Sequence, residues 1–318
     1  MTIDAPTLLH AAALAAGAQQ YPAGALYVVA TPIGNLADLS LRALHVLALA
    51  DTIACEDTRH TGALLRHLGL DKPLLALHEH NENTAAGRVI GLLAEGRRVA
   101  YVSDAGTPAV SDPGAALVAA VRQAGLRSVP IPGASSALAA VSVAGDAAAP
   151  GFRFVGFLPA KGGERRAAVQ AVAACLDQQV LFEAPHRIEA LLTVLAEQLG
   201  RRAVTLCREL TKQFETVVTL PAAELPAWLA ADPNRGRGEF VLVVHSLAPV
   251  TPADDALPDE TLKVLQVLLA ELPVKQAVGL AATLTGQGRN ALYEAALKLR
   301  DGRSAKPPRL NVSHQGDA

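Results

Sequence analysis

The sequence lacks the short motifs that mark several common enzyme classes. Neither G-x-G-x-x-G nor G-x-x-x-x-G-K-[ST] follows a predicted strand, so a dinucleotide fingerprint and a P-loop are both missing. A G-x-S-x-G element is missing as well. These absences argue against a nicotinamide-dependent enzyme, an ATPase and a Ser-His-Asp hydrolase.

Cysteine is scarce. The chain has 3 cysteines, Cys55, Cys175 and Cys207, and none of them forms a C-x-x-C pair. An odd number without such spacing predicts reduced thiols in a cytoplasmic protein and no structural zinc site. His78 and His80 are alternate residues after a predicted strand, so they would point to opposite faces, and we expect no metal site there.

Long apolar runs are also missing. No stretch approaches the ~20 apolar residues that are needed to span a bilayer. The apolar run Leu8–Ala18 has no positively charged flank, because the first basic residue is Arg42. We therefore expect a soluble protein with neither a secretory signal nor a membrane helix.

The chain carries no large excess of charge of either sign. With 28 Lys and Arg against 30 Asp and Glu, the net charge is -2, which argues against indiscriminate binding of polyanions. The region from Pro273 to Arg309 differs, because Glu294 and Asp301 are its only acidic residues. Its basic residues are Lys275, Arg289, Lys298, Arg300, Arg303, Lys306 and Arg309. This region is a basic patch on an otherwise neutral protein.

Three turn-forming segments each follow a short apolar strand and precede a helical stretch. They are Thr31–Asn35, Ser103–Pro108 and Pro132–Ser136. A plain turn explains any one of them, but three at the carboxyl ends of neighbouring strands predict a ligand crevice. Glycine there lets a ligand approach the backbone. Asp104 and Asp112 favour a ligand with hydroxyl groups or a positive centre.

Strands and helices alternate in the first half of the chain, which predicts an α/β fold with a mostly parallel sheet and flanking helices. The series includes strand Thr52–Cys55 and helix Thr58–His67, and it ends with helix Ser135–Val143. In the second half, the short connection between strands Ala203–Cys207 and Glu215–Thr219 favours an antiparallel return and thus a mixed sheet.

A helical extension follows, in which a Gly-containing turn precedes a basic helix, as in a helix-turn-helix. A small helical bundle that caps the second domain is the alternative. The predicted segments are a flexible N-terminal arm (1–24), an N-terminal α/β domain (25–147), a C-terminal mixed α/β domain (148–248), the helical extension (258–302) and a disordered tail (303–318).

Several motifs occur in an order that resembles the tetrapyrrole methylase superfamily and, within it, the methyltransferases of small-subunit ribosomal RNA. They are ATPIGNL (30–36), EDTR (56–59), SDAGTP (103–108), FLPAK (157–161), RELTK (208–212) and RNALY (289–293). The resemblance runs from about Leu26 to Arg300. It implies a two-domain clamp, S-adenosyl-L-methionine as methyl donor, 2'-O-methylation of a cytidine ribose in the decoding region of 16S ribosomal RNA, and a homodimer.

The resemblance also implies that the donor lies between the three turns and the second domain. The implied donor-binding residues are Pro32, Gly34, Asn35, Ser103, Asp104, Ala105, Gly106, Thr107, Pro108, Gly133, Ser135, Ser136 and Phe157. Ala184 departs from the pattern, because relatives often carry a small hydroxyl residue at that position. The side chain of Ala184 therefore has no hydrogen-bonding role.

A ribose hydroxyl is weakly acidic, so a carboxylate or a lysine of lowered pKa is expected to take its proton. The candidates are Glu183, Glu209 and Lys212. Arg59 and Arg187 are candidate phosphate forks, which would each bind a phosphate through two N–H groups. An ordinary salt-bridge network is the alternative role of Arg187 and of Glu209. The remaining candidate substrate contacts are His78, Asn81, Lys161 and Arg289.

Two other functions fit parts of this pattern. A methylase of the same fold could act on a tetrapyrrole or a diphthine precursor, although such a substrate would not require the basic helical extension. A non-catalytic protein that binds RNA or the ribosome would need no crevice for a methyl donor. Donor binding and the basic extension are the features that separate these alternatives.

Overall fold

The computed structural model describes residues 4–78, 81–110, 114–160, 162–247 and 257–303. The chain forms two compact units, Met1–Leu247 and Ala248–Ala318. None of the helices in these described ranges is both long enough and apolar enough to cross a membrane. The predicted tail lies outside the described residues from position 304 onward.

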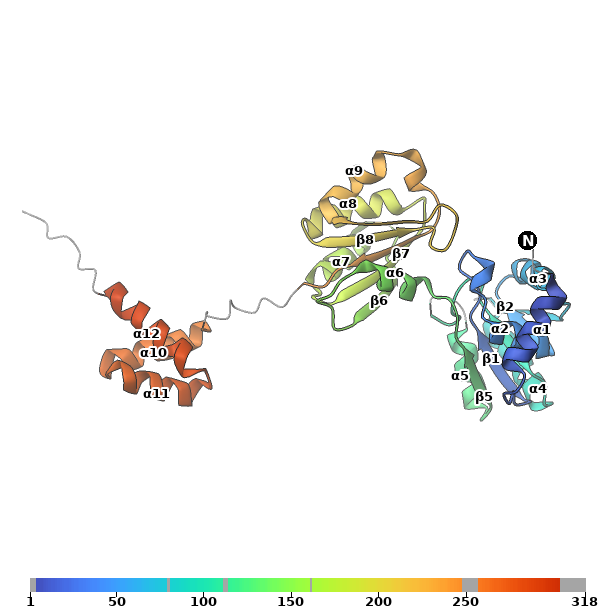
Figure 1. Cartoon of the computed structure of the whole chain (residues 1–318), viewed down its shortest axis with the longest axis horizontal. Coiled ribbons are helices and arrows are strands. Elements are labelled where there is room, and N and C mark those ends of the chain that lie inside the picture. The colour runs from blue at the N-terminus through green and yellow to red at the C-terminus, as the bar shows by residue number, and fades with distance from the viewer. Residues whose placement is uncertain (1–3, 79–80, 111–113, 161, 248–256, 304–318) are drawn as a thin grey trace, which may run out of the picture. The chain divides into compact units, whose positions relative to one another are not determined.

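The first unit begins with a five-stranded sheet whose strands are all parallel, as predicted (Figure 1). The strands lie in the order β3-β2-β4-β1-β5. Their bounds are β1 (Ala25–Val29), β2 (Thr52–Cys55), β3 (Leu74–Ala76), β4 (Val99–Val102) and β5 (Arg127–Ile131). Every residue of β2 and β4 is buried, as expected for central strands that are covered on both faces.

Helices cover both faces of this sheet. They are α1 (Ala5–Ala16), α2 (Leu41–Leu49), α3 (Thr58–His67), α4 (Glu82–Ala94) and α5 (Ala115–Gln123), with a short 3-10 turn η1 (Leu36–Asp38). Side chains cap the N-termini of α2 and α3: Ser40 accepts a hydrogen bond from Ala43 N, and Asp57 accepts one from Arg59 N. One core lies under α1, α2 and α3, and a second lies under α4 and α5.

The first 24 residues are not a flexible arm throughout. Residues 5–16 form α1, which packs against α2, buries Ala12 in the first core and also buries Ala16. Tyr21 follows the helix and donates a hydrogen bond to Ala16 O. The Ala-rich sequence of α1 shows little contrast between its two faces, and for this reason its pattern did not reveal the packing.

A second five-stranded sheet completes the first unit, in the order β6-β7-β10-β8-β9. Strands β6 and β7 are parallel and the other pairs are antiparallel, so the predicted mixed sheet is confirmed. The strands are β6 (Phe152–Phe157), β7 (Gln178–Glu183), β8 (Ala203–Arg208), β9 (Thr216–Pro221) and β10 (Phe240–Val244). Helices α7 (Gly162–Ala174), α8 (Ile188–Leu199) and α9 (Leu225–Ala230) accompany it, with the 3-10 turns η2 (Ala222–Glu224) and η3 (Pro233–Gly236).

Helix α6 (Ser136–Ala144) belongs to the core of the second sheet and not to that of the first. Its buried residues Ala137, Ala140 and Ala144 pack with Val180 and Val241. The sequence placed this helix in the first domain because it follows β5 directly. Helix α6, which precedes the boundary expected near residue 147, therefore packs with the part of the first unit that follows it.

The second unit contains α10 (Asp259–Glu271), α11 (Val274–Thr285) and α12 (Arg289–Arg303), close to the predicted helices. Leu265, Val278, Ala281 and Leu292 are among the residues of its separate apolar core. Gly286 ends α11 with φ +70°, in the left-handed conformation that glycine adopts readily. The turn between α11 and α12 is therefore short and well defined.

Candidate active site

The three predicted turns converge at one edge of the first sheet. Strands β4, β1 and β5 are neighbours, and Thr31 and Gly106 exchange backbone hydrogen bonds of 2.9 and 3.1 Å between the first and second turns. Thr107 Oγ1 donates a 3.0 Å hydrogen bond to Ala134 O in the third turn. The predicted convergence is confirmed.

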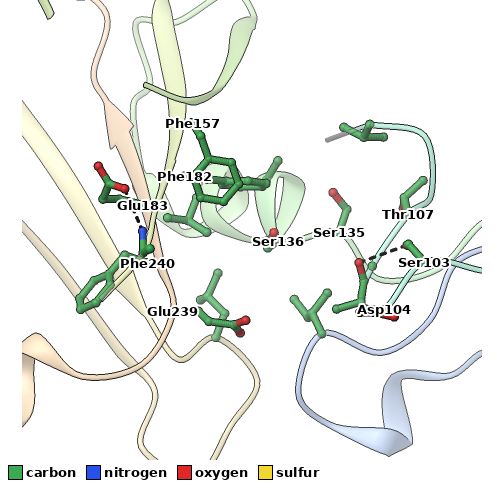
Figure 2. Close-up of a pocket in the computed structure, with 18 of the residues that line it drawn as sticks. Ser103, Asp104, Thr107, Ser135, Ser136, Phe157, Phe182, Glu183, Glu239 and Phe240 are labelled. Atoms are coloured by element: carbon green, nitrogen blue, oxygen red, sulfur yellow. Dashed lines mark hydrogen bonds between the residues drawn. The ribbon is translucent and has the colours of Figure 1, made fainter. Parts of the chain in front are cut away.

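A cavity of about 550 Å³ lies beside these turns, and its walls come from both sheets of the first unit (Figure 2). Its lining residues are Ile33, Glu56, Ser103, Asp104, Ala105, Gly106, Thr107, Val110, Ser135, Ser136, Ala137, Phe157, Phe182, Glu183, Ala184, Pro185, Leu210, Glu239, Phe240 and Val241. This volume lies within the usual range of small-molecule sites.

Nine of the predicted site residues line the cavity: Ser103, Asp104, Ala105, Gly106, Thr107, Ser135, Ser136, Phe157 and Glu183. Other predicted donor-binding residues lie in the same turns but not in the lining: Pro32, Gly34, Asn35, Pro108 and Gly133. Asn35 caps η1 by accepting a hydrogen bond from Ala37 N at 3.1 Å. A Cβ at Gly133 would lie 3.0 Å from that of Ala30, so this glycine permits close packing.

The cavity is acidic. Glu56, Asp104, Glu183 and Glu239 belong to its lining, and among the described residues the lining includes no lysine or arginine. Asp104 Oδ1 accepts a 3.2 Å hydrogen bond from the backbone N–H of Asp57. This composition favours a ligand with a positive centre and disfavours a phosphate group inside the cavity.

The opposite wall is partly aromatic. Phe157 is 55% exposed, and its ring meets that of Phe182 edge-on, with the centroids 5.6 Å apart. Phe182 meets Phe154 in the same manner at 5.1 Å. An exposed ring held in this way can stack against a flat ligand group.

Glu183 is fully buried between two arginines. Its carboxylate pairs with Arg165 and with Arg187, whose Nε lies 2.8 Å from Oε1, and it accepts a hydrogen bond from Ala184 N. Figure 2 shows the carboxylate of Glu183 directed away from Asp104. Arg187 also donates to Leu158 O. Arg187 therefore forms the salt-bridge network that was the alternative to a phosphate fork.

Glu209 and Lys212 form a second charged group, together with Glu239. Lys212 Nζ donates to Glu209 Oε1 at 2.8 Å and to Glu239 Oε2 at 2.9 Å. Partial burial acts to lower the pKa of Lys212, but its two carboxylate partners outweigh this and raise it. Burial likewise opposes ionisation of Glu209, yet hydrogen bonds from Lys212 and Glu239 N leave its pKa lowered. The expected lysine of lowered pKa is thus contradicted at Lys212.

The predicted substrate-binding residues are spread over the surface. Arg59 is 90% exposed and pairs with Asp57 at 2.6 Å, next to the cavity residue Asp104. Asn81 binds the backbone at His78 N and Ala76 O, so it shapes the loop after β3. Arg289 is exposed at the start of α12 in the second unit. Lys161 lies outside the described residues.

The sequence did not point to Glu239, because site residues were expected only after the ends of strands and Glu239 lies just before a strand. Strand β10 is antiparallel to β7 and β8, and Phe240 pairs with Glu183 on one side and Arg208 on the other. The start of β10 therefore lies at the edge where β7 and β8 end.

Among the described residues, no group of three or more His, Cys, Asp or Glu side chains is arranged to hold a metal ion.

Two families match separate parts of the chain. Residues 25–226 match the family of Tetrapyrrole (Corrin/Porphyrin) Methylases. Residues 255–300 match the RsmI C-terminal HTH domain. The second match supports the helix-turn-helix interpretation of α11 and α12 over a simple cap.

Several similar proteins carry the name Ribosomal RNA small subunit methyltransferase I. The protein from Pseudomonas aeruginosa is 49% identical over 89% of this chain and 99% of its own length. Those from Neisseria meningitidis serogroup A and Escherichia coli O157:H7 are each 48% identical, over 87% and 86% of this chain and 94% and 95% of their own lengths.

Solved structures show the same fold. Uroporphyrin-III-C-methyltransferase from Thermus thermophilus matches with a TM-score of 0.50 and 25% identity, over 71% of this chain and 96% of its own. The cobalt precorrin-4 methyltransferase CbiF matches with a TM-score of 0.53 and 17% identity, over 71% of this chain and 98% of its own. The matched part is long enough to contain both sheets of the first unit.

Proposed function

The chain belongs to the tetrapyrrole methylase family, and from this premise we propose that it transfers a methyl group from S-adenosylmethionine to small-subunit ribosomal RNA. The observation that carries this proposal is the joining, in one chain, of an acidic methylase cavity to a separate helical unit that matches an HTH domain. The chain is an S-adenosylmethionine-dependent methyltransferase.

The residues of the cavity fit this methyl donor. The carboxylates of Glu56 and Asp104 suit its positively charged sulfur and amino group, and Ser103, Ser135 and Ser136 supply hydroxyls for its polar groups. Gly106 has φ +81°, and a Cβ there would lie 3.3 Å from Ile33 Cγ2, so glycine keeps this part of the wall open. Phe157 offers a ring for the adenine or for the base of the nucleoside whose ribose is methylated.

When bound, the donor supplies a methyl group that is already activated by the positive sulfur. The protein therefore needs to hold donor and acceptor in line, exclude water and receive a proton, and positioning supplies much of the rate. The turns at β1, β4 and β5 hold one side of this arrangement, and the ends of β7 and β8 with the start of β10 form the other. A clamp of two sheets suits an in-line displacement.

The acceptor that we propose is the 2'-hydroxyl of a cytidine in the decoding region, as the resemblance implies. Because the cavity is acidic, the RNA phosphates would remain outside it while one nucleoside enters. Arg59 at the rim and the basic residues of α11 and α12 are then the candidate phosphate contacts. A tetrapyrrole or diphthine substrate would leave the basic residues of α11 and α12 without a role.

The resemblance further leads us to propose a homodimer that acts in the cytoplasm. Light scattering on the purified chain measures its mass in solution, and a value of twice 32.9 kDa is expected. A mass that stays at that of a single chain at micromolar concentration would contradict the dimer.

Transfer of labelled methyl groups to RNA tests the proposed function. Small subunits from cells that lack this gene are incubated with the purified chain and methyl-labelled S-adenosylmethionine, and the labelled nucleoside is then identified. We expect 2'-O-methylcytidine at one position. Label on a tetrapyrrole and none on the subunits would support the alternative methylase.

A further inference from the structure

Glu239 lies in the cavity, yet the sequence motifs assign it no role. Its side chain is 74% exposed, and it lies just before β10, on the wall formed by the second sheet. Oε2 accepts the hydrogen bond from Lys212, whereas Oε1 has no hydrogen-bond or ion-pair partner within the described ranges. Figure 2 shows the carboxylate directed toward the side on which Asp104 lies.

Hydrogen bonds to the side chain of Glu209 hold both Glu239 and its partner Lys212 in place. Glu209 Oε1 accepts hydrogen bonds from both Lys212 Nζ and Glu239 N, at 2.8 and 2.9 Å. Glu209 and Thr211 have φ of +53° and +67°, a left-handed conformation that is strained for a residue other than glycine. Such strain persists only where the surrounding structure enforces it, so the position of Lys212 is closely determined.

Two glycines leave space for the same group. A Cβ at Gly238 would lie 2.5 Å from the carboxyl group of Glu209, and one at Gly34 would lie 2.5 Å from Lys212 Cγ. Both glycines have positive φ, +90° and +153°. Gly34 belongs to the turn after β1, so the stem of Lys212 packs between the two halves of the first unit.

The other candidate proton acceptors are less well placed. Glu183 is enclosed by Arg165 and Arg187. Lys212 has a raised pKa and remains an ammonium group. Asp104 lies in the turn that is proposed to hold the donor, and Glu56 directly follows β2 on the wall of the same sheet. An in-line transfer requires the acceptor oxygen to approach from the opposite side, which is the wall that carries Glu239.

We propose that Glu239 takes the proton of the hydroxyl that is methylated and that Lys212 positions its carboxylate. This assignment rests on the proposed function. As the bond between the hydroxyl oxygen and the methyl carbon forms, the carbon–sulfur bond breaks and its electron pair passes to sulfur. The hydroxyl proton moves to Glu239 Oε1 and then to water.

The test compares Glu239→Gln with the wild type in single-turnover methylation of small subunits across a range of pH. Loss of the proton acceptor should lower the rate about 100-fold or more and should abolish the decline in rate on acidification. The dissociation constant of S-adenosylmethionine, measured by calorimetry, should stay unchanged. Glu95→Gln is the matched control, because Glu95 is also exposed and paired with a cation, Arg97, at 3.3 Å, outside the cavity.

Lys212→Met tests the positioning role separately. Lys212→Met should lower the single-turnover rate while the dissociation constant of S-adenosylmethionine stays unchanged, and Lys212→Arg, which keeps the cation, should recover part of that rate, which a merely structural role would not do. A wild-type pH profile and rate in Glu239→Gln would overturn the assignment, and so would a parallel loss of donor affinity. An inactive wild-type chain would instead contradict the proposed function together with this assignment. If the wild-type chain is active, the result for Glu239→Gln tests the assignment alone.

Discussion

At the residue scale, Gly106 is the residue whose replacement tests the cavity most simply. Its φ of +81° and the proximity of Ile33 mean that valine would both strain the turn and fill the approach to the donor. We expect Gly106→Val to lower the affinity for S-adenosylmethionine by at least about tenfold, or 1.4 kcal/mol. Calorimetry measures this change.

Gly96→Val is the control for Gly106→Val. Gly96 has nearly the same φ, +82°, but a Cβ there would meet nothing within 4 Å. Both variants should lose a similar amount of stability, about 1–3 kcal/mol from the backbone alone, while only Gly106→Val should weaken donor binding. Equal donor affinities in the two variants would place the donor elsewhere.

At the scale of secondary-structure elements, the buried carboxylate of Glu183 joins the end of β7 to α7, through Arg165, and to Arg187. Glu183→Gln would leave two guanidinium groups with an uncompensated charge, so we expect a loss of about 3–5 kcal/mol in the free energy of unfolding. Urea denaturation measures it, with the exposed Glu189→Gln on α8 as the control. Unchanged stability with lost activity would instead favour a catalytic Glu183.

Asp146 ties the end of α6 to the end of β10. It accepts hydrogen bonds from Ser246 N and Oγ and from Gln178 Nε2. Burial opposes ionisation, but the bonds from Ser246 outweigh it, so the pKa of Asp146 is lowered. A lowered pKa in the folded state stabilises the protein above the ordinary value near 4, and this contribution disappears as the pH falls through the folded-state pKa.

Asp146→Asn should therefore cost about 1–3 kcal/mol of stability at pH 7. The difference from wild type should shrink as the pH is lowered below about 4. Unfolding curves at several pH values measure both effects, and Asp71→Asn, an exposed residue, is the control. A difference between wild type and Asp146→Asn that is independent of pH would contradict the role of the charge.

The sequence predicted most individual elements but not all of their partners. Strand β2 and helix α3 have the predicted bounds, because short apolar runs and the cap at Asp57 mark them locally. The packing of the Ala-rich helices α1 and α6 was not predicted, since their patterns do not show which surface they pack against. Glu239 was missed because its position depends on the antiparallel pairing of β10.

At the scale of the whole molecule, the two compact units predict a separation of functions. Truncation after Val250 should leave donor binding and the melting temperature of the first unit unchanged. It should weaken RNA binding, and each lost phosphate contact should reduce the slope of log K against log salt by about 0.7 to 0.9. Fluorescence anisotropy over a salt series measures that slope.

A purely stabilising role of the second unit predicts a different result for the same truncation. If the helices of the second unit only stabilised the first, the shortened chain would lose melting temperature and donor affinity together, and the salt slope of RNA binding would stay the same. A destabilised protein with an unchanged slope would contradict the RNA contact.

The most direct measurement of the central claim is the mass spectrum of ribonuclease fragments of 16S ribosomal RNA from cells with and without this gene. We expect one fragment from the decoding region to lose the mass of a single methyl group on a cytidine ribose when the gene is absent. Re-expression of the wild-type chain should restore that methyl group. An identical methylation pattern in both cell lines would contradict the account.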